Sequence, residues 1–334
     1  MLFRLSAFLL FFGFYLMLIF YAPDWLARSI VMGSGNPVEV LVSPGMNARQ
    51  AAEEFFIRSA VRDVSSLSFW LTKLGVDREL QPGVYSVRPG SAWEVASQIR
   101  DQRPHQENAT IIPGSTFHEL CESFGDRFEQ SLLDDRLFPE QVRQFLPARA
   151  EDRVAFLLPE TYAFSSASTL CGELVAAASK QWWRMAMELR TPDYWANRSS
   201  AFILDLATMA SLVEREAVID EERPVIAGVL YNRLEKNMPL QVDATVVFAW
   251  SLRGRSLTRV LFSDLKIESD YNTYMNRGLP PGPICVPSRQ SWDAAIFPDV
   301  HKYLYYVLAS GQSHVFSRTY EEHLKAIRER NSDR

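Results

Sequence analysis

Residues 207–245 read ATMASLVEREAVIDEERPVIAGVLYNRLEKNMPLQVDAT. On a helical wheel of about 100° per residue, the helix that opens this stretch has one face formed by Ile203, Ala207, Ala210, Glu214 and Ala217. A glutamate among small apolar residues faces packed protein or a cleft, where desolvation would raise its pKa and let it act as a general acid. Glu216 falls on roughly the opposite face and is expected to point to water. The alternative for Glu214 is a cap or a salt bridge to a neighbouring segment.

The composition is that of a globular protein. The chain has 334 residues, of which 47% are hydrophobic and 22% are charged, which is enough apolar material for about two packed domains. A net charge of -5 and the lack of any lysine or arginine block argue against a nucleic-acid partner. The three cysteines are Cys121, Cys171 and Cys285, and they form no CxxC pair. A zinc ribbon and a thioredoxin-like redox pair are therefore not supported.

The N-terminal segment predicts a membrane anchor. Residues 5–23 carry no charge and would span about 29 Å as a helix, close to the thickness of the hydrocarbon core of a bilayer. A cleaved signal peptide is the alternative, but the apolar run is long and no small-x-small cleavage site follows it. We expect residues 1–37 to form a cytoplasmic tip, a single transmembrane helix and a linker. The rest of the chain would then lie outside the cytoplasmic membrane.

Residues 38–105 predict a small strand-helix-helix-strand module. A short apolar strand, a Pro-Gly turn and a capped helix recur here and again just after it. The predicted capping boxes are Asn47 with Gln50, Ser91 with Glu94, and Thr116 with Glu119. The order and size of the elements resemble a LysM-like glycan-binding module, and the alternative is a plain packing subdomain.

Residues 106–334 predict a mixed α/β domain, so the whole chain is expected to be α+β. Residues 126–156 are helical and charged, and we interpret them as a mobile or solvated spacer. A long helix over residues 169–190 precedes the helix that carries Glu214, which Ser199 or Ser200 would cap. Residues 269–287 predict a long ordered loop rich in proline. Residues 301–317 predict a β-hairpin, followed by a closing amphipathic helix.

Most catalytic motifs are absent from the sequence. There is no HExxH, Walker loop, GxGxxG or GxSxG, and five scattered histidines do not predict a metal site. Residues 263–266 match the SxxK nucleophile motif, but no SDN or KTG accompanies it. Acid–base chemistry by carboxylates, without a metal or a cofactor, is the chemistry that remains.

The C-terminal half resembles the YceG-like family of endolytic murein transglycosylases. The matching motifs are LPETY at 158–162, MASLVERE at 209–216, YNRL at 231–234, LQVDATV at 240–246, YNTYMNRGLPPGPI at 271–284, and the YLYYV and HVFS strands. The resemblance implies cleavage of the β-1,4 bond between N-acetylmuramic acid and N-acetylglucosamine, leaving a 1,6-anhydro end. It also implies trimming or termination of nascent glycan strands. The chain departs from the family pattern at Val242, Ala244 and residues 285–288.

The resemblance places the catalytic glutamate at Glu214. A single acid is sufficient because muramic acid supplies its own 6-hydroxyl, whereas ordinary glycosidases need two carboxylates. The candidates for holding the sugars are Gln241, Asp243, Asn272 and Tyr274. The expected partners are peptidoglycan strands, the cytoplasmic membrane and peptidoglycan synthases.

Two other kinds of function stay open at this point. One is a two-carboxylate glycoside hydrolase with Asp243, Glu268 or Asp270 as the second group. The other is a non-catalytic glycan-binding scaffold of wall synthesis.

Overall fold

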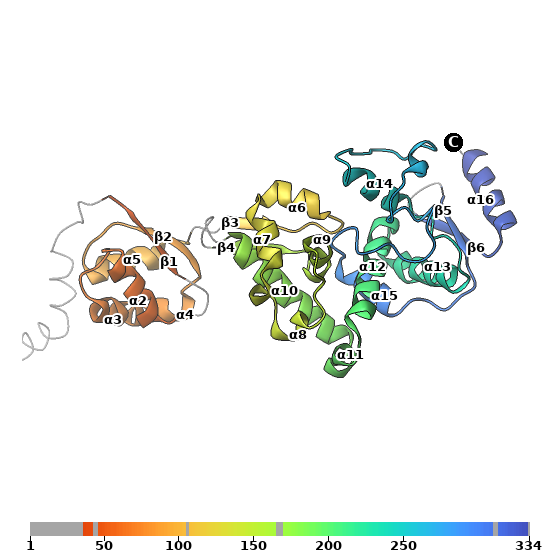
Figure 1. The fold of residues 1–334 in the computed structure, drawn as a ribbon. Helices are drawn as coiled ribbons and strands as arrows, with labels where there is room; N and C mark the ends of the chain where they lie inside the picture. Colours follow the sequence, from red (N-terminus) through yellow and green to blue (C-terminus); the bar gives the residue numbers. More distant parts are fainter. Residues whose placement is uncertain (1–35, 43–45, 105–106, 165–169, 310–312, 333–334) are drawn as a thin grey trace, which may run out of the picture. The chain divides into compact units, whose positions relative to one another are not determined.

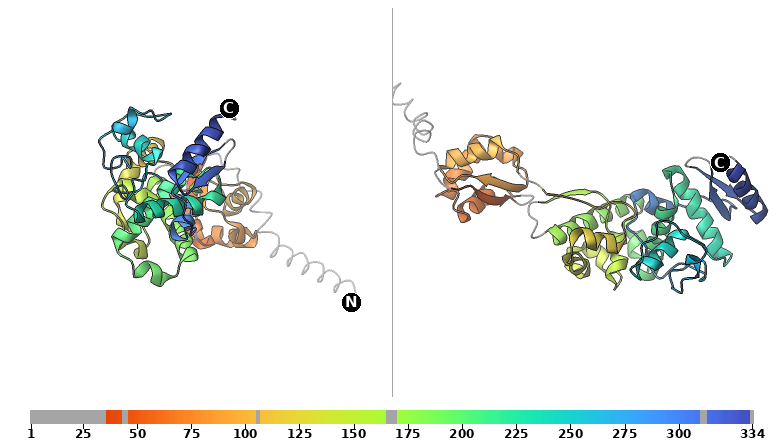
Figure 2. Two further views of the ribbon diagram at one scale, coloured as in Figure 1. Left: turned by 90° about the vertical axis from the view of Figure 1, so that its right-hand side faces the viewer. Right: turned by 90° about the horizontal axis from the view of Figure 1, so that it is seen from above.

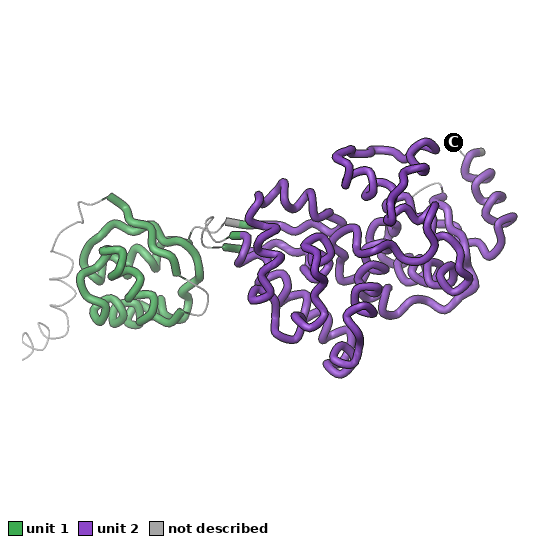
Figure 3. Tube along the Cα trace, viewed as in Figure 1, with its two compact units in different colours: residues 1–108, 163–170 green, residues 109–162, 171–334 purple. Residues whose placement is uncertain are grey.

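The computed structural model describes residues 36–42, 46–104, 107–164, 170–309 and 313–332 (Figure 1). The predicted transmembrane segment lies outside these ranges. Within them, no helix combines the length and the apolar character needed to cross a membrane. The chain divides into two compact units, Met1–Asn108 with Ala163–Leu170, and Ala109–Tyr162 with Cys171–Arg334 (Figure 3).

The first unit has the predicted order of strand, helices and strand. Its elements are β1 (Val38–Val42), α2 (Ala48–Ile57), α3 (Val64–Lys73), α4 (Val76–Glu79), β2 (Gly83–Val87) and α5 (Ala92–Asp101). The strands β1 and β2 are antiparallel, with Val40 opposite Tyr85. Both side chains are buried in one apolar cluster with residues of α2, α3 and α5, among them Phe55 and Leu71. The unit therefore has a core of its own.

The three predicted capping boxes are all present. They are Asn47 with Gln50 at α2, Ser91 with Glu94 at α5, and Thr116 with Glu119 at α6 (Phe117–Phe124). In each, the cap side chain accepts from the backbone N–H three residues on, and the Glu or Gln side chain accepts from the backbone N–H of the cap residue. These signals are local, which is why the sequence alone was sufficient to find them.

The remaining elements are mostly helices. They are β3 (Glu107–Thr110), α7 (Arg127–Leu133), η1 (Asp135–Leu137), α8 (Glu140–Arg143), α9 (Ala150–Arg153), η2 (Val154–Phe156), β4 (Thr161–Phe164), α10 (Leu170–Leu189), α11 (Pro192–Ala196), α12 (Ser200–Glu216), η3 (Asp220–Glu222), α13 (Arg223–Glu235), α14 (Asp243–Ser251), η4 (Asp264–Lys266), α15 (Arg289–Ile296), β5 (Tyr305–Leu308), β6 (His314–Ser317) and α16 (Tyr320–Ser332). Within the described chain, β3 pairs with β4, and β5 pairs with β6. The fold is thus α+β, as expected.

The interpretation of residues 126–156 as a solvated spacer was wrong. This segment buries Phe128, Phe138 and Phe145 almost completely. The ring of Phe145 lies 6.1 Å from that of Trp182 on α10, and Phe156 lies 5.1 Å from the same indole. The segment is part of the core, and the reason is that its aromatic residues find partners far away in the sequence.

The helix α12 lies at the centre of the second unit. It contacts α13, α14 and α15 (Figures 1 and 2). Ser199 caps its start, accepting from the backbone N–H of Phe202 at 3.1 Å. On the predicted face, Ile203, Ala207 and Ala210 are fully buried. The helix ends at Glu216, so both candidate glutamates belong to its last turn.

Two segments from the C-terminal part of the chain reach this helix end. The predicted loop between η4 and α15 has no helix or strand, and the hairpin of β5 and β6 forms as predicted, with Tyr306 opposite Phe316. The helix α16 packs against both strands of the hairpin. A Cβ atom at Gly228 would collide with the backbone oxygen of Asp299 and the ring of His301. Glycine there allows α13 to approach the segment that leads into the hairpin.

Candidate active site at the end of helix α12

Glu214, in the last turn of α12, lies between the start of α13 and the start of α15. Its side chain is 7% exposed, and it forms an ion pair with Arg223 at the start of α13. Its Oε2 atom accepts from Ser288 N (2.8 Å), Ser288 Oγ (2.5 Å), Ser291 Oγ (2.7 Å) and Arg223 Nη1 (3.2 Å). Ser288 is the N-cap of α15, so the carboxylate also lies at the positive end of that helix dipole.

The contacts of Glu214 are those of a buried structural ion pair. All four donors converge on one carboxylate oxygen, and among the described residues Oε1 accepts no hydrogen bond. The same guanidinium of Arg223 contacts Asp220 at 2.8 Å and Ser291 at 2.6 Å. The carboxylate therefore ties α12 to α13 and α15, which is the alternative that the sequence had left open for it.

Glu216 does not point freely to water, and this expectation was wrong. Its carboxylate is half-buried and accepts a hydrogen bond of 2.7 Å from the hydroxyl of Tyr306 on β5. Within the described chain, Tyr306 is its only hydrogen-bond partner. The helical wheel assigned this face to solvent, but the β5–β6 hairpin, some 90 residues later in the sequence, covers it.

Desolvation by the surrounding protein raises the pKa of Glu216, and the charge of nearby Asp243 raises it further. The hydrogen bond from Tyr306 and the positive charges of His314 and Arg233 oppose this increase. A carboxyl group in such surroundings can hold a proton at higher pH than an exposed glutamate. Glu216 thus combines a raised pKa with residual access to solvent, as a general acid requires.

Asp243 and Tyr274 form a second polar pair close to Glu216. The hydroxyl of Tyr274 donates to Asp243 Oδ1 at 2.5 Å. Burial raises the pKa of Tyr274, and its bond to Asp243 and the charge of Glu216 add to this effect, so the phenol keeps its proton. Asp243 is exposed, and it begins α14. The structure therefore brings two of the predicted sugar ligands together beside Glu216.

Gln241 lies on the loop that leads into α14. Its backbone has φ of 53°, in the left-handed region that few non-glycine residues adopt. Its N–H donates to Thr273 O at 3.1 Å, and its side-chain oxygen lies 3.5 Å from Arg233 Nη1. Gln241 is exposed, so its amide can reach a ligand.

Asn272 has a different place from the other predicted ligands. It is fully buried, and its amide donates to the backbone oxygens of Leu265 and Ile267 at 2.9 and 2.8 Å. Its side-chain oxygen accepts from the N–H of Tyr274 at 3.0 Å. Asn272 thus shapes the loop that presents Tyr274, and its polar atoms are already used.

Sequence reasoning did not select Glu222 and His314. The ring atom Nδ1 of His314 lies 2.6 Å from Glu222 Oε2, and the backbone N–H of His314 donates to Glu222 Oε1 at 2.7 Å. Both side chains are almost buried. The HVFS motif contained the signal, but only the folded hairpin shows that this histidine meets a glutamate from η3.

The second unit has a pocket of about 310 Å³. It is lined by Arg215, which lies between the two glutamates in sequence, by Ala244, which follows Asp243, and by residues of α6, α14 and the loop after it. No group of three or more His, Cys, Asp or Glu side chains in the described ranges has an arrangement that could hold a metal ion. The three cysteines are free thiols.

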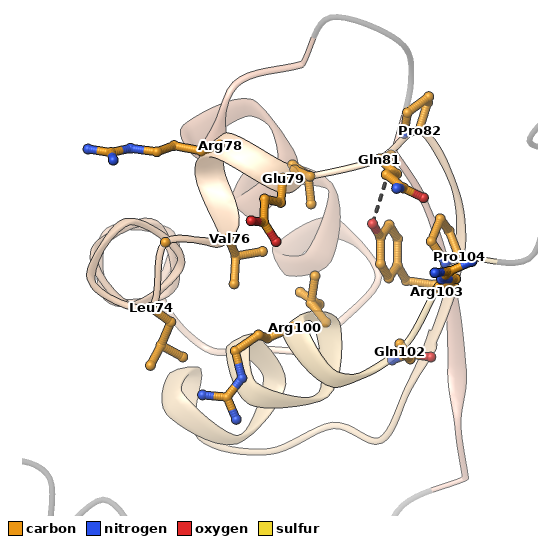
Figure 4. A pocket seen from close by; sticks show the side chains of 14 residues that line it. Leu74, Val76, Arg78, Glu79, Gln81, Pro82, Arg100, Gln102, Arg103 and Pro104 are labelled. Carbon is orange, nitrogen blue, oxygen red and sulfur yellow. Dashed lines mark hydrogen bonds between the residues drawn. The ribbon is translucent and has the colours of Figure 1, made fainter.

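The first unit has a separate pocket of about 850 Å³ between the α3–β2 connection and the end of α5. Figure 4 shows the Glu79 side chain directed into this space and Arg100 at its edge. The hydroxyl of Tyr85 donates to Gln81 O at 3.0 Å. Pro82 and Pro104 add apolar surface.

The fold and the site define an α+β protein with a carboxylate-centred site at the end of a buried helix. The YceG-like family model matches residues 40–329, and the chain therefore belongs to this family. An endolytic murein transglycosylase of Bacillus subtilis strain 168 is 36% identical over 319 residues, which cover 90% of this chain and 87% of that protein.

Two further relatives agree with this assignment. An endolytic murein transglycosylase of Streptococcus pneumoniae serotype 2 is 29% identical over 68% of this chain and 45% of its own length. The crystal structure of a yceG-like protein from Listeria monocytogenes matches with a TM-score of 0.53 and 25% identity, covering 87% of this chain and 98% of that one.

Proposed function

We propose that this chain is an endolytic murein transglycosylase whose general acid is Glu216. The observation that carries the proposal is the half-buried carboxyl group of Glu216, with a raised pKa and a hydrogen bond from Tyr306, in a chain of the YceG-like family. The relatives named endolytic murein transglycosylase suggest the substrate, which is peptidoglycan.

The reaction needs one proton donor that afterwards becomes a base. Protonated Glu216 gives its proton to the glycosidic oxygen as the bond to C1 of the muramic acid breaks. The 6-hydroxyl of the same sugar attacks C1, and ionised Glu216 accepts the proton of that hydroxyl. The products are a new N-acetylglucosamine end with a free hydroxyl and a 1,6-anhydromuramic end, and no water is consumed. In this proposal Asp243, Tyr274 and Gln241 hold the sugars.

In this proposal Glu214 positions the helix end that carries Glu216. Its ion pair with Arg223 and its bonds to Ser288 fix the last turn of α12. The sequence pattern favoured Glu214 itself as the acid, and this remains the competing assignment. If Glu216 is the acid, Glu216→Gln loses activity. If Glu214 is the acid, Glu214→Gln loses activity.

Hydrolysis is the second candidate reaction, and the observation that favours it is the proximity of Asp243 to Glu216. Asp243 would activate a water molecule while Glu216 protonates the leaving oxygen. Glu268 and Asp270 lie exposed on the loop after η4. Among the described residues, neither of these two carboxylates forms a hydrogen bond or an ion pair with the site.

Cleavage in ¹⁸O-labelled water separates the two reactions. Purified glycan strands are digested with the chain without residues 1–37, and the masses of the products are measured by mass spectrometry. Transglycosylation predicts muramic ends that are lighter by one water and carry no label. Labelled reducing ends would refute transglycosylation and direct attention to Asp243. A non-catalytic scaffold would release no products at all.

We further propose that residues 1–37 anchor the protein in the cytoplasmic membrane with the N-terminus inside, so that it trims or terminates nascent strands beside peptidoglycan synthases. The charge-free segment 5–23 supports this placement. A reporter that works only in the cytoplasm, fused after Arg334, should be silent. An active reporter would contradict the orientation.

The first unit is proposed to bind glycan as a LysM-like module. Its strand-helix-helix-strand order and the pocket near Arg100 and Gln102 support this role. Deletion of residues 38–105 should weaken binding to isolated sacculi and leave some cleavage. Unchanged binding would favour a packing role.

A further inference from the structure

A polar pair that the proposed reaction does not use joins η3 to strand β6 of the hairpin. Glu222 contacts His314 with both carboxylate oxygens, one at the ring atom Nδ1 (2.6 Å) and one at the backbone N–H (2.7 Å). The side chains of His314 and Glu222 are only 7% and 11% exposed. A carboxylate that holds both the ring and the backbone of a histidine fixes the orientation of the imidazole. Among the described residues, the other ring nitrogen of His314 makes no hydrogen bond.

This pair is in contact with the phenol that binds Glu216. The ring of His314 meets that of Tyr306 edge-on, with 5.5 Å between the centroids and 87° between the planes. The hydroxyl of Tyr306 in turn donates to Glu216 at 2.7 Å. A continuous series of contacts therefore runs from η3, through both strands of the hairpin, to the last residue of α12.

Charged and titratable groups from several elements surround Glu216. Asp243 on α14 raises the pKa of Glu216, whereas Arg233 on α13 and the protonated form of His314 on β6 lower it. Tyr306 on β5 donates to the carboxylate, and Tyr274 on the loop after η4 lies near enough to sense its charge. Arg233 and, when its ring is protonated, His314 are thus two groups whose positive charge lowers the pKa of Glu216.

We propose that His314, oriented by Glu222, is a positioning residue for Glu216 and acts through Tyr306. The proposal rests on the proposed function, because it assumes that Glu216 is the acid. The imidazole supports the phenol ring from the side, so that its hydroxyl remains directed at the carboxylate. When His314 is protonated, its charge also favours the loss of the proton from Glu216.

The test compares His314→Phe, His314→Asn and Glu222→Gln with the parent protein, and Val315→Ala is the matched control. Val315 is the next residue on β6 and is 43% exposed. For each variant, kcat and KM for glycan strands are measured from pH 4 to 9, and circular dichroism confirms the fold. Phenylalanine keeps an aromatic ring but loses the bond to Glu222 and the charge.

For His314→Phe and Glu222→Gln we expect kcat to fall about tenfold with KM nearly unchanged, since an alignment is lost and not a sugar contact. Loss of a positive charge removes an influence that lowers the pKa of Glu216. The alkaline limb of the kcat profile should therefore move to higher pH in His314→Phe, and Val315→Ala should match the parent protein. His314→Asn can still donate to Glu222 but has no ring to support the phenol, so it should lose kcat as His314→Phe does and show the same shifted limb.

The proposal is overturned if folded His314→Phe has the kcat and the pH profile of the parent protein. It is equally overturned if activity falls in the folded His314 variants with no shift of the alkaline limb, since that pattern indicates a purely structural role. The Glu216→Gln variant separates this outcome from a failure of the proposed function. Full activity of Glu216→Gln would refute the acid itself, whereas an inactive Glu216→Gln beside normal His314 variants refutes only the positioning role.

Discussion

Glu214 and Glu216 are two residues apart on one helix, yet their surroundings differ in kind. Glu214 meets a guanidinium, two hydroxyls and a backbone N–H on one oxygen, between α13 and α15. Glu216 meets a single phenol and a neighbouring carboxylate, under the β5–β6 hairpin. The comparison shows that two neighbouring carboxyl groups of similar burial can be held in opposite ways. What matters is whether the surroundings neutralise its charge or favour its proton.

The largest expected effect is that of Glu216→Gln on the rate. Glutamine keeps the volume and can accept from Tyr306, but it cannot deliver a proton. We expect cleavage to fall by about two to four orders of magnitude while the thermal unfolding temperature changes little. The cleavage rates of the variant and of the parent protein are measured on purified glycan strands. Glu214→Gln, assayed at equal folded concentration, is the matched control and should keep most of its activity per molecule.

Arg223→Met tests the surroundings of Glu214. It leaves the carboxylate of Glu214 buried without its cation, because both side chains are almost inaccessible to solvent. We expect the free energy of unfolding to fall by about 3 kcal/mol, measured by urea denaturation. The activity of the folded fraction should fall far less than in Glu216→Gln. A variant as stable as the parent protein would contradict a structural ion pair.

Tyr306→Phe should have an intermediate effect. Removal of the hydroxyl takes away the only hydrogen bond to Glu216 among the described residues, and that bond lowers the pKa of this carboxyl. The rate should fall about tenfold, and its alkaline limb should move to higher pH. A pH profile of kcat measures both. A limb displaced to lower pH would show that another group is the acid.

The pH dependence of stability should show a smaller effect. The pKa of Glu216 is raised in the folded protein, so the folded state binds this proton more tightly than the unfolded chain does. Its contribution to stability is therefore present below the ordinary glutamate pKa and is lost as the pH rises through the raised value. Unfolding by urea across this range should show the decline in the parent protein, and a smaller decline in Glu216→Gln.

The smallest expected effect is that of Asp243→Asn. The amide can still accept from Tyr274, and the single-acid route does not need a second carboxylate. We expect a loss of less than about tenfold and no change in product mass. Complete loss of cleavage by this variant would favour the two-carboxylate hydrolase.

Local signals in the sequence predicted the elements that depend on local chemistry. The capping boxes, the N-cap Ser199, the proline-rich loop and the final hairpin were all found where expected. The buried face of α12 was also right, because Ile203, Ala207 and Ala210 follow the helical period. These patterns need no knowledge of the tertiary fold.

The errors concern contacts between distant segments. The helical wheel could not show that Tyr306 would cover Glu216, nor that Arg223 would neutralise Glu214. Likewise, the charged segment 126–156 was not recognised as core, because Phe145 packs on Trp182 of a later helix. The sequence therefore located the candidate site to one helical turn, but it did not show which segments cover the two faces of that turn.

Direct titration of Glu216 tests the central claim most closely. The chain without residues 1–37 is labelled with ¹³C at the glutamate carboxyl groups. The Glu216 resonance is assigned by its loss in Glu216→Gln. The structure predicts that this carboxyl titrates above the ordinary glutamate value of 4.5. The alkaline limb of the kcat profile should report the same ionisation. A resonance that titrates at or below that value, as in an exposed glutamate, would contradict the assignment of Glu216 as the proton donor.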